Sequence, residues 1–464
     1  MRWRVYLRRT VHWQGMYKGG SDMKREEYLQ KIGEQIRFEK AREGVKAELE
    51  WHIEDQKEEF LCAGMTEAEA EEAAVREMGD PVAVGTELDR IHRPRMAWNC
   101  IILIGVLYLA GLLLQRLLGA QTESSFYGGG VLTYAAKLLF GFGVMLLICY
   151  VDYSRIARWI RQIWAALFLV LTLGACVFGT PVNGANFWIY GALNVKLLVF
   201  LFVPLYGGLI FWYRGRGRRG LFCVLLWGLL PAAVCILIRS FATAVLLAVL
   251  MLVLLSLAVY RGWFERKGRK LLLMSWGAFL VLIASFFLVC WNMGGYRAER
   301  IRAILHPYST EAGERLEILR EIALSSQFAG SSPWAGRVPD YGDGYSFMFS
   351  HITARYGILA VLLLAGTILG LFLYFLRNVL RQRNQLGMIM GSGCVLVLMA
   401  QTILYILTNG GLVLHGYNYC PFLTYGGTGV MVTNILLGIL LSIYRYENIP
   451  LVMAVQPAPF GKAH

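Results

Sequence analysis

Several basic side chains stand within or beside segments of the sequence that are otherwise apolar. Lys196 lies inside a hydrophobic run, where an ionisable group is costly and usually faces a cavity. His351 and Arg355 are four residues apart, so a helix would place them on one face. Arg300 and Arg302 follow another hydrophobic run, and a guanidinium group can hold a phosphate with two parallel hydrogen bonds. These residue types favour a site for a phosphate-bearing ligand.

Each of these residues also has a purely structural explanation. Lys196 can extend its ammonium group along apolar surface to the membrane interface. Arg300 and Arg302 can anchor the chain at the same interface, and His351 with Arg355 can form a polar contact between helices. The sequence leaves both readings open for each residue.

The elements that carry these residues are hydrophobic runs of membrane-spanning length. The chain has 464 residues, of which 57% are apolar and only 16% are charged, whereas a soluble domain carries about 25% charged residues. From residue 97 onward the apolar runs approach the roughly 20 residues that a helix needs to cross a bilayer. We therefore predict an all-α, polytopic membrane protein with ten spans. They run over residues 97–119, 129–152, 160–180, 188–213, 219–238, 240–260, 271–293, 348–376, 386–408 and 422–444.

The loop charges orient these spans, because cytoplasmic loops are enriched in Lys and Arg. Both termini are therefore expected in the cytoplasm, with the long loop 294–347 on the outer face of the bacterial inner membrane. The concentration of Lys and Arg in the cytoplasmic loops also accounts for the net charge of +14, so a nucleic-acid partner is not needed to explain it. Basic residues gather in loops 153–159, 214–218, 261–270 and 377–385. Loops 120–128, 181–187 and 409–421 contain no Lys or Arg.

A charged segment precedes the spans. Residues 23–95 read as short amphipathic helices, and Thr66 with Glu69 forms a capping-box pattern. This segment resembles the cytoplasmic permease-prefix helical domain of bacterial membrane proteins. Residues 1–22 differ from the rest, and Lys18-Gly19-Gly20 matches a translated ribosome-binding site, so we expect Met23 to be the true start. Residues 447–464 are expected to form a cytoplasmic tail after the membrane domain at 97–446.

Four motifs then occur in order along the membrane domain. The last span opens with PFLTYGGT at 421–428, which resembles the terminal signature of the SEDS family (FtsW, RodA, SpoVE). GANFWI at 184–189, YRAERIRAILHP at 296–307 and FMFSHITARYG at 347–357 resemble three further family motifs. The resemblance covers residues 98–446, and ten spans with a large outer loop between the seventh and eighth also fit it.

The resemblance implies a peptidoglycan glycosyltransferase. SEDS proteins polymerise lipid II, an undecaprenyl-linked precursor, and usually work with a class B penicillin-binding protein. Polymerisation needs a base or a charge-stabilising carboxylate and cations near the leaving pyrophosphate. The family's essential Asp is replaced here by Ser346, whose hydroxyl cannot serve as a carboxylate base at neutral pH. Asp343 is three residues earlier, so Asp343 and Ser346 are the candidate catalytic residues, with a turn as the structural alternative for Asp343.

The family's other acidic positions are also altered. Lys196 stands alone where the family has a carboxylate and a lysine, and Arg239 begins a segment that has lost its Asp. The glycines of the terminal signature are expected to shape a break or close packing at the end of the last span. The predicted substrate-binding residues are Lys196, Arg239, Arg300, Arg302, His351, Arg355, Tyr425, Gly426, Gly427 and Thr428.

Two other functions stay open at this point. Loss of the family's acidic residues at the positions described above favours a non-catalytic membrane regulator or scaffold of envelope assembly. A flippase for the lipid-linked precursor is the third candidate, although the spans offer no acidic proton-coupling site. The sequence contains no Gly-x-x-x-x-Gly-Lys-Ser/Thr motif and no His/Asp cluster, so we expect neither a metal nor another cofactor.

Overall fold

The computed structural model describes residues 23–119, 130–182, 185–264, 268–293, 298, 302, 306, 311–335, 338, 347–382, 384–413 and 419–447. These residues divide into two compact units, one ending at Arg95 and the other beginning at Met96. The predicted start at Met23 and the predicted tail concern residues 1–22 and 448–464, which lie outside the described residues.

Within the described residues, the first unit contains four helices. Thr66 and Glu69 form the capping box that the sequence predicts at the start of the third of them. Asp80 caps the fourth, because its carboxylate accepts the backbone N–H of Ala83 at 2.8 Å and Pro81 needs no partner there. The four helices are α2 (Arg25–Gln35), α3 (Glu39–Cys62), α4 (Glu67–Glu77) and α5 (Pro81–His92).

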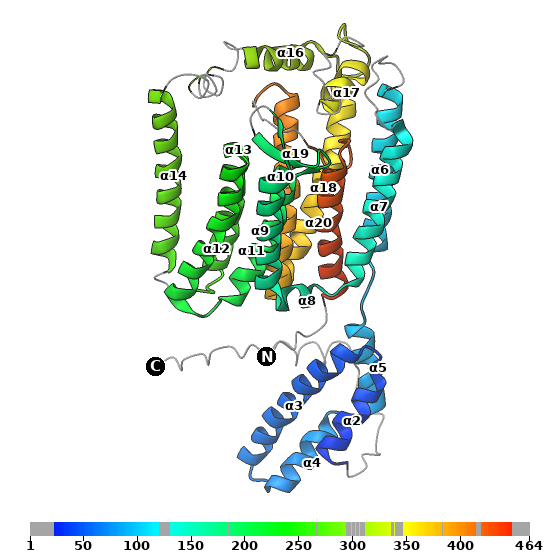
Figure 1. Ribbon diagram of the computed structural model, residues 1–464. Coiled ribbons are helices and arrows are strands. Elements are labelled where there is room, and N and C mark those ends of the chain that lie inside the picture. The colour runs from blue at the N-terminus through cyan, green and yellow to red at the C-terminus, as the bar shows by residue number, and fades with distance from the viewer. Residues whose placement is uncertain are drawn as a thin grey trace. The chain divides into compact units, whose positions relative to one another are not determined.

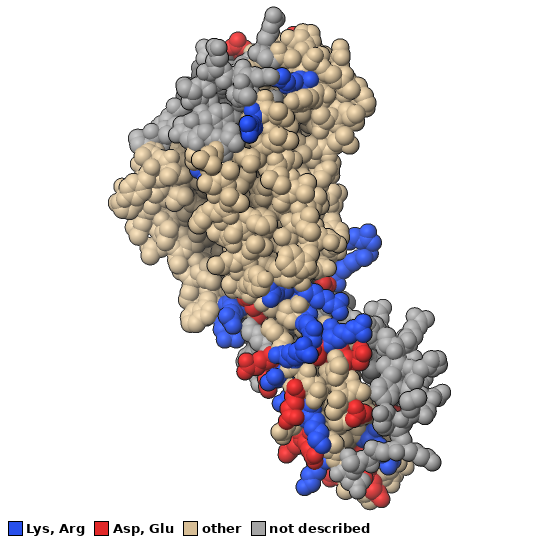
Figure 2. Space-filling view, turned by 90° about the vertical axis from the view of Figure 1, so that its right-hand side faces the viewer, with Lys and Arg blue, Asp and Glu red and all other residues tan. Residues whose placement is uncertain are grey.

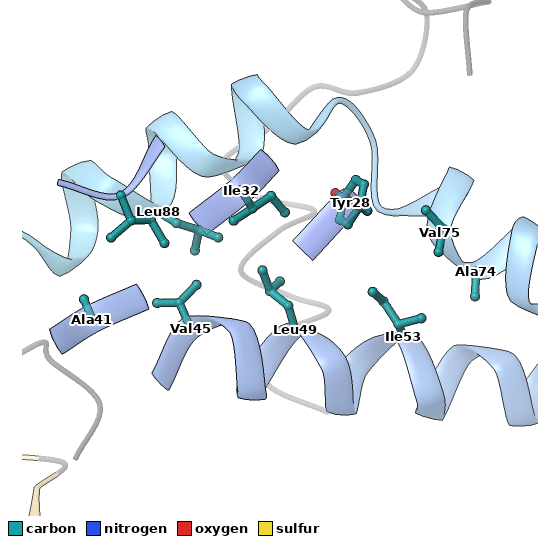
Figure 3. Close-up of a cluster of buried hydrophobic side chains, with 10 residues drawn as sticks. Tyr28, Ile32, Ala41, Val45, Leu49, Ile53, Ala74, Val75 and Leu88 are labelled. Carbon is teal, nitrogen blue, oxygen red and sulfur yellow. The ribbon is translucent and has the colours of Figure 1, made fainter. Parts of the chain in front are cut away.

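Apolar stripes on these helices meet in one core (Figure 3). Val45, Leu49 and Ile53 recur at helical spacing along α3 and face Ile32 of α2. The buried Asp89 of α5 ties the helices together, since its carboxylate accepts the backbone N–H of Arg37 and a guanidinium N–H of Arg93. The unit therefore has its own core and its own ion pair, between the buried Asp89 and the exposed Arg93.

The second unit confirms the prediction of ten spans. Within its described residues, ten helical segments are long and apolar enough to cross a membrane. Figure 1 shows them as a bundle, and Figure 2 shows one flank as a broad band of uncharged side chains. They are α6 (Trp98–Gly119), α7 (Gly130–Tyr150), α9 (Ile160–Val177), α10 (Val195–Leu198) continued by η1 (Val199–Leu201) and α11 (Phe202–Trp212), α12 (Gly217–Leu237), α13 (Phe241–Tyr260), α14 (Gly268–Met293), α18 (Ile358–Arg381), α19 (Gln385–Asn409) and α20 (Gly427–Arg445).

A three-stranded antiparallel sheet was not predicted. It consists of β1 (Gly179–Val182), β2 (Ala185–Ile189) and β3 (Leu193–Asn194), in that order. The predicted start of the fourth span at residue 188 was therefore wrong, because 185–189 is a strand. A short apolar run reads equally well as a strand or as part of a helix. Tyr190 and Gly191, both with positive φ, make the turn into β3.

The predicted span 348–376 is two helices. The short α17 (Met348–Tyr356) ends at Gly357, whose φ of 91° interrupts the helix before α18. A side chain at Gly357 would meet the carbonyl oxygen of Phe328 at 2.7 Å, and the N–H of Ile358 donates to the carbonyl of Gln327. The break thus lets the chain that follows α16 (Glu311–Ser325) pack against the bundle.

The two ends of the bundle differ. The sheet, α16 and α17 lie at one end, called here the sheet end (Figure 1). The short helix α8 (Tyr153–Arg158) lies at the opposite end, called the α8 end, with Asp152 capping it. The described turn between α11 and α12, which contains Arg214 and Arg216, is also at the α8 end.

The centre of the bundle is formed by α11, α19 and α20. Between two-thirds and four-fifths of each corresponding span is buried inside the unit, against 6% of the α14 span. Close backbone approach makes this possible, because a methyl group at Gly207 of α11 would lie 2.8 Å from the carbonyl oxygen of Ile389 in α19. Small residues permit such contacts between membrane helices.

Replacing Asp89 by Asn should destabilise the first unit in a pH-dependent way. The hydrogen bonds from Arg93 and Arg37 outweigh burial and hold the pKa of Asp89 below its usual value. The carboxylate therefore contributes above about pH 4, the pKa of a free Asp, and this contribution is lost as the pH falls through the lowered pKa. Urea unfolding of residues 23–95 at pH 7 should show a loss of about 1–3 kcal/mol for Asp89→Asn.

That loss should shrink in acid, and the exposed Glu87→Gln variant should change stability by less than about 1 kcal/mol. A loss for Asp89→Asn that is the same at pH 7 and at pH 2 would contradict this account of Asp89.

Gly207→Ala should destabilise the second unit. The added methyl group must push α11 and α19 apart, at a cost of about 1–3 kcal/mol. Gly366→Ala in α18 is the matched control, because a methyl group there meets nothing within 4 Å and removes backbone entropy from the unfolded chain. Thermal unfolding in detergent should show a lower midpoint for the first variant alone. Equal midpoints would argue against close packing at Gly207.

Candidate functional site

The short helix α10 positions Lys196. Asn194 caps this helix, since its side-chain oxygen accepts the backbone N–H of Lys196 at 3.0 Å. The ammonium group of Lys196 lies 3.6 Å from the ring centroid of Phe187 in β2, a cation–π contact. The unpredicted sheet thus provides an aromatic surface for a lysine that is half-buried in an apolar setting.

Lys196 also lines a small cavity inside the bundle. The cavity has a volume of about 20 Å³, which is enough for one water molecule. Its polar wall comes from segments far apart in the sequence, with Thr243 on α13, Gln401 and Tyr405 on α19, and Tyr419 ahead of α20. Its apolar wall consists of Leu197, Phe200, Leu246 and Leu404.

Residues 421–426 of the terminal signature are non-helical, and its last two residues, Gly427 and Thr428, begin α20. Because α20 begins at Gly427, the predicted span start at 422 is five residues too early. Backbone groups of this segment find partners in the protein, as groups in a water-poor setting require. The amide of Gln115 in α6 donates to the carbonyl of Leu423 at 2.6 Å, and the hydroxyl of Thr424 accepts the N–H of Cys420 at 2.7 Å.

Tyr425 of the signature contacts a second lysine, which the sequence analysis missed. Lys137 of α7 donates to the hydroxyl of Tyr425 at 3.1 Å, and its ammonium lies 4.4 Å from the Tyr425 ring centroid. Its aliphatic chain would touch any side chain placed at Gly427. The signal for Lys137 was present in the sequence, since a lysine inside an apolar span is a candidate site residue by itself.

Thr428 joins the signature to the turn that carries Lys196. Its hydroxyl accepts the backbone N–H of Asn194 at 2.9 Å and donates to the carbonyl of Ala192 at 3.3 Å. Gly426 borders open space, because a methyl group there would meet nothing within 4 Å. The signature therefore contacts Lys137 through Tyr425 and supports the start of α10 through Thr428.

The other predicted residues are placed as follows. His351 and Arg355 are half-buried on α17, and neither lines the cavity. This helix packs on α19, since the N–H of Met348 donates to the Tyr405 hydroxyl at 2.9 Å and the hydroxyl of Ser350 donates to the backbone carbonyl of Asn409. The structure thus links α17 to the cavity wall through Tyr405.

Two predicted arginines lie outside the cavity wall. Arg239 is exposed in the turn between α12 and α13, and Arg302 is exposed with its guanidinium 5.8 Å from the ring centroid of Trp291. Arg300, Asp343 and Ser346 lie outside the described residues. No three His, Cys, Asp or Glu side chains within the described ranges gather as possible metal ligands.

Comparison with known proteins places this arrangement in a family. Residues 95–449, more than half of the chain, match the cell cycle proteins FtsW, RodA and SpoVE as a family. The chain belongs to the FtsW/RodA/SpoVE family. The family prediction is therefore confirmed, and the chain is a multi-pass membrane protein.

Named members of the FtsW/RodA/SpoVE family are similar at low identity. The peptidoglycan glycosyltransferase MrdB of Escherichia coli K12 is 25% identical over 187 residues, which are 38% of this chain and 50% of MrdB. The chain thus spans about half the length of that relative. The probable peptidoglycan glycosyltransferase FtsW of Coxiella burnetii is 24% identical over 307 residues, covering 61% of this chain and 77% of that protein.

Solved structures share the fold. A chain from a peptidoglycan synthase complex that coordinates polymerisation and crosslinking superposes with a TM-score of 0.62 at 20% identity, covering 75% of this chain and 98% of that one. The rod shape determining protein RodA of Thermus thermophilus gives a TM-score of 0.52 at 17% identity, with 76% and 97% coverage. The helical membrane fold predicted from the sequence is therefore confirmed.

Thr428→Val should destabilise the site because it leaves the buried N–H of Asn194 without its partner. We expect a loss of about 1–3 kcal/mol in unfolding free energy and faster hydrogen exchange at residues 192–196. Thr428→Ser is the control, since it keeps the hydroxyl and should retain most of the protection. Unchanged exchange in Thr428→Val would show that this hydroxyl does not hold α10 in place.

Proposed function

We propose that this protein is a glycosyltransferase that polymerises lipid II into peptidoglycan glycan strands. Membership of the FtsW/RodA/SpoVE family and the names of its relatives support this activity. The observation that carries the proposal is the signature segment 421–428, which contacts Lys137 and supports the helix that bears Lys196. Two cations held beside one segment fit a substrate whose leaving group is a pyrophosphate.

The reaction needs positive charge where the leaving group departs. A sugar hydroxyl of one lipid II attacks the anomeric carbon of another, the bond to the pyrophosphate breaks, and undecaprenyl pyrophosphate leaves. Lys196 and Lys137 would stabilise the charge on that pyrophosphate. Arg300 and Arg302 would add guanidinium contacts to phosphate oxygens. We assign these four residues to substrate binding.

Proton removal from the attacking hydroxyl needs a base. We propose that Asp343 supplies it, because Ser346 stands where the family has its essential Asp and a serine hydroxyl is not ionised at neutral pH. His351 and Arg355 on α17 follow this loop by one to two helical turns, which supports a role for them in binding the same substrate.

Orientation follows from the charged loops. Arg155 and Arg158 of α8 and Arg214 and Arg216 in the α11–α12 turn mark the α8 end, so we propose that it faces the cytoplasm of the bacterial inner membrane. The sheet end and loop 294–347 would then face outward. Residues 23–95 would form a cytoplasmic prefix domain, and both termini would be cytoplasmic.

The proposed function also includes a partner protein. The solved chain that superposes with a TM-score of 0.62 comes from a peptidoglycan synthase complex. We propose that this chain likewise works with a class B penicillin-binding protein, which would crosslink the strands. A non-catalytic regulator of envelope assembly is the second candidate, and Ser346 in place of the family's Asp is the observation that favours it.

Purified protein in nanodiscs, with its candidate penicillin-binding partner, should convert fluorescent lipid II into glycan strands. Lys196→Met should lower the rate by about 10²-fold or more, the effect of removing one charge-stabilising group. Asp343→Ala should abolish strand formation. The exposed Lys270→Met variant at the far end of α14 should match the wild type.

The controls separate the alternatives. Absence of strands from the wild type under all conditions would favour the regulator, and full activity of Asp343→Ala would reject Asp343 as the base. Labelled lipid II placed on one leaflet of a liposome would reveal flipping if it crossed the bilayer without being polymerised.

A further inference from the structure

The carboxamide of Gln401 is buried without a hydrogen-bond partner among the described residues. Gln401 is 7% exposed, and neither its oxygen nor its nitrogen is paired within that part of the chain. A buried polar group that is left unpaired costs about 1–3 kcal/mol. Such groups are rare in folded proteins, so each one points to strain, to a bound water or to a ligand that the protein chain does not itself provide.

The other polar groups of the same cavity differ in this respect. The Thr243 hydroxyl is 2.7 Å from the hydroxyl of Ser240, and the Tyr419 hydroxyl is 2.9 Å from that of Thr433. The Tyr405 hydroxyl accepts the backbone N–H of Met348. Only the amide of Gln401 offers both an acceptor and donors to the cavity without a described protein partner.

The chemistry of the wall limits what such an amide would bind. A carboxamide is neutral, so it does not favour a phosphate, and Lys196 beside it disfavours a cation. A secondary amide is complementary to it, because the Gln401 oxygen can accept an N–H while the Gln401 nitrogen donates to a C=O. The apolar side chains Leu197, Phe200, Leu246 and Leu404 suit a methyl group next to that amide.

An acetamido group is an amide with an adjoining methyl group, so it has both features. We infer that Gln401 binds the acetamido group of a lipid-linked amino sugar and thereby selects the substrate. This inference rests on the proposed function, because the amino sugars of lipid II carry such groups. Gln401 is thus a substrate-binding residue that determines specificity.

The cavity must widen for this binding. Its volume of about 20 Å³ holds one water, which is smaller than an acetamido group. Lys196 is the wall residue with the longest flexible side chain, and its ammonium contacts the ring of Phe187 at 3.6 Å from the ring centroid. Withdrawal of Lys196 toward the pyrophosphate would open the space beside Gln401.

Discrimination between two lipids tests this inference. The protein in nanodiscs is titrated with lipid II and with an analogue in which hydroxyl groups replace both acetamido groups, and the bound lipid is measured by native mass spectrometry. The wild type should bind lipid II at least about tenfold more tightly, since a site built for a polar group rejects a ligand that lacks it. Gln401→Leu should bind the two lipids within about twofold of each other.

Control variants separate binding from folding. Gln401→Leu should unfold at the same temperature as the wild type or a higher one, because it removes an unpaired buried amide. Gln162→Leu, at an exposed position of α9, should keep the wild-type discrimination. Equal binding of the two lipids by the wild type, or preserved discrimination in Gln401→Leu, would overturn the inference and leave the proposed function standing. A wild type that binds neither lipid would overturn both.

Discussion

The site depends on hydrogen-bond partners for the non-helical backbone of the signature segment. The side-chain amide of Gln115 supplies one of them by donating to the carbonyl of Leu423. Cys420 and Leu423 are buried, so non-helical backbone is stable there only where the protein supplies hydrogen-bond partners. Thr424 closes the turn from within through the N–H of Cys420. With these partners the chain can stay non-helical up to Gly427, and the side chains of Tyr425 and Thr428 are free to contact α7 and the start of α10.

This constraint explains how two lysines are held in an apolar bundle. An ionisable group in a membrane span is costly unless it has partners or faces a cavity. Lys137 has the hydroxyl and ring of Tyr425, and Lys196 has the ring of Phe187. The positions of both lysines therefore depend on non-helical elements, the signature segment in one case and the sheet in the other. The proposed chemistry uses the same two cations.

Much of the fold was predictable from the sequence, because hydropathy reports span length directly. The ten predicted apolar runs correspond to ten helical segments long enough to span a membrane, and the family motifs correctly predicted the fold. The strand 185–189 was not predictable, since an apolar run of that length has no period that separates strand from helix. The break at Gly357 was missed for a similar reason, because the backbone that packs closely against Gly357 is at Phe328, 29 residues earlier in the sequence. Local patterns do not encode such a contact.

The site was predicted less completely than the fold. Lys196, Tyr425 and Thr428 were found through motifs, whereas Lys137 belongs to no motif, and its position inside an apolar span was its signal in the sequence. Gln401 gave no signal in the sequence, since one glutamine in an apolar helix says nothing about its partners until the neighbouring helices are in place. Sequence motifs thus identify the residues that are typical of the family. The three-dimensional packing is needed to identify the residues that contact them.

In the proposed mechanism, Lys137 and Lys196 both act on one anionic group. The most direct measurement is the affinity of the protein in nanodiscs for undecaprenyl pyrophosphate, compared among the wild type, Lys137→Met, Lys196→Met and the double variant. Each single variant should bind about tenfold more weakly, which is about 1.4 kcal/mol. The double variant should then lose less than the product of the two single effects, because both lysines contact the same ligand. Unchanged affinity in either single variant would contradict the claim.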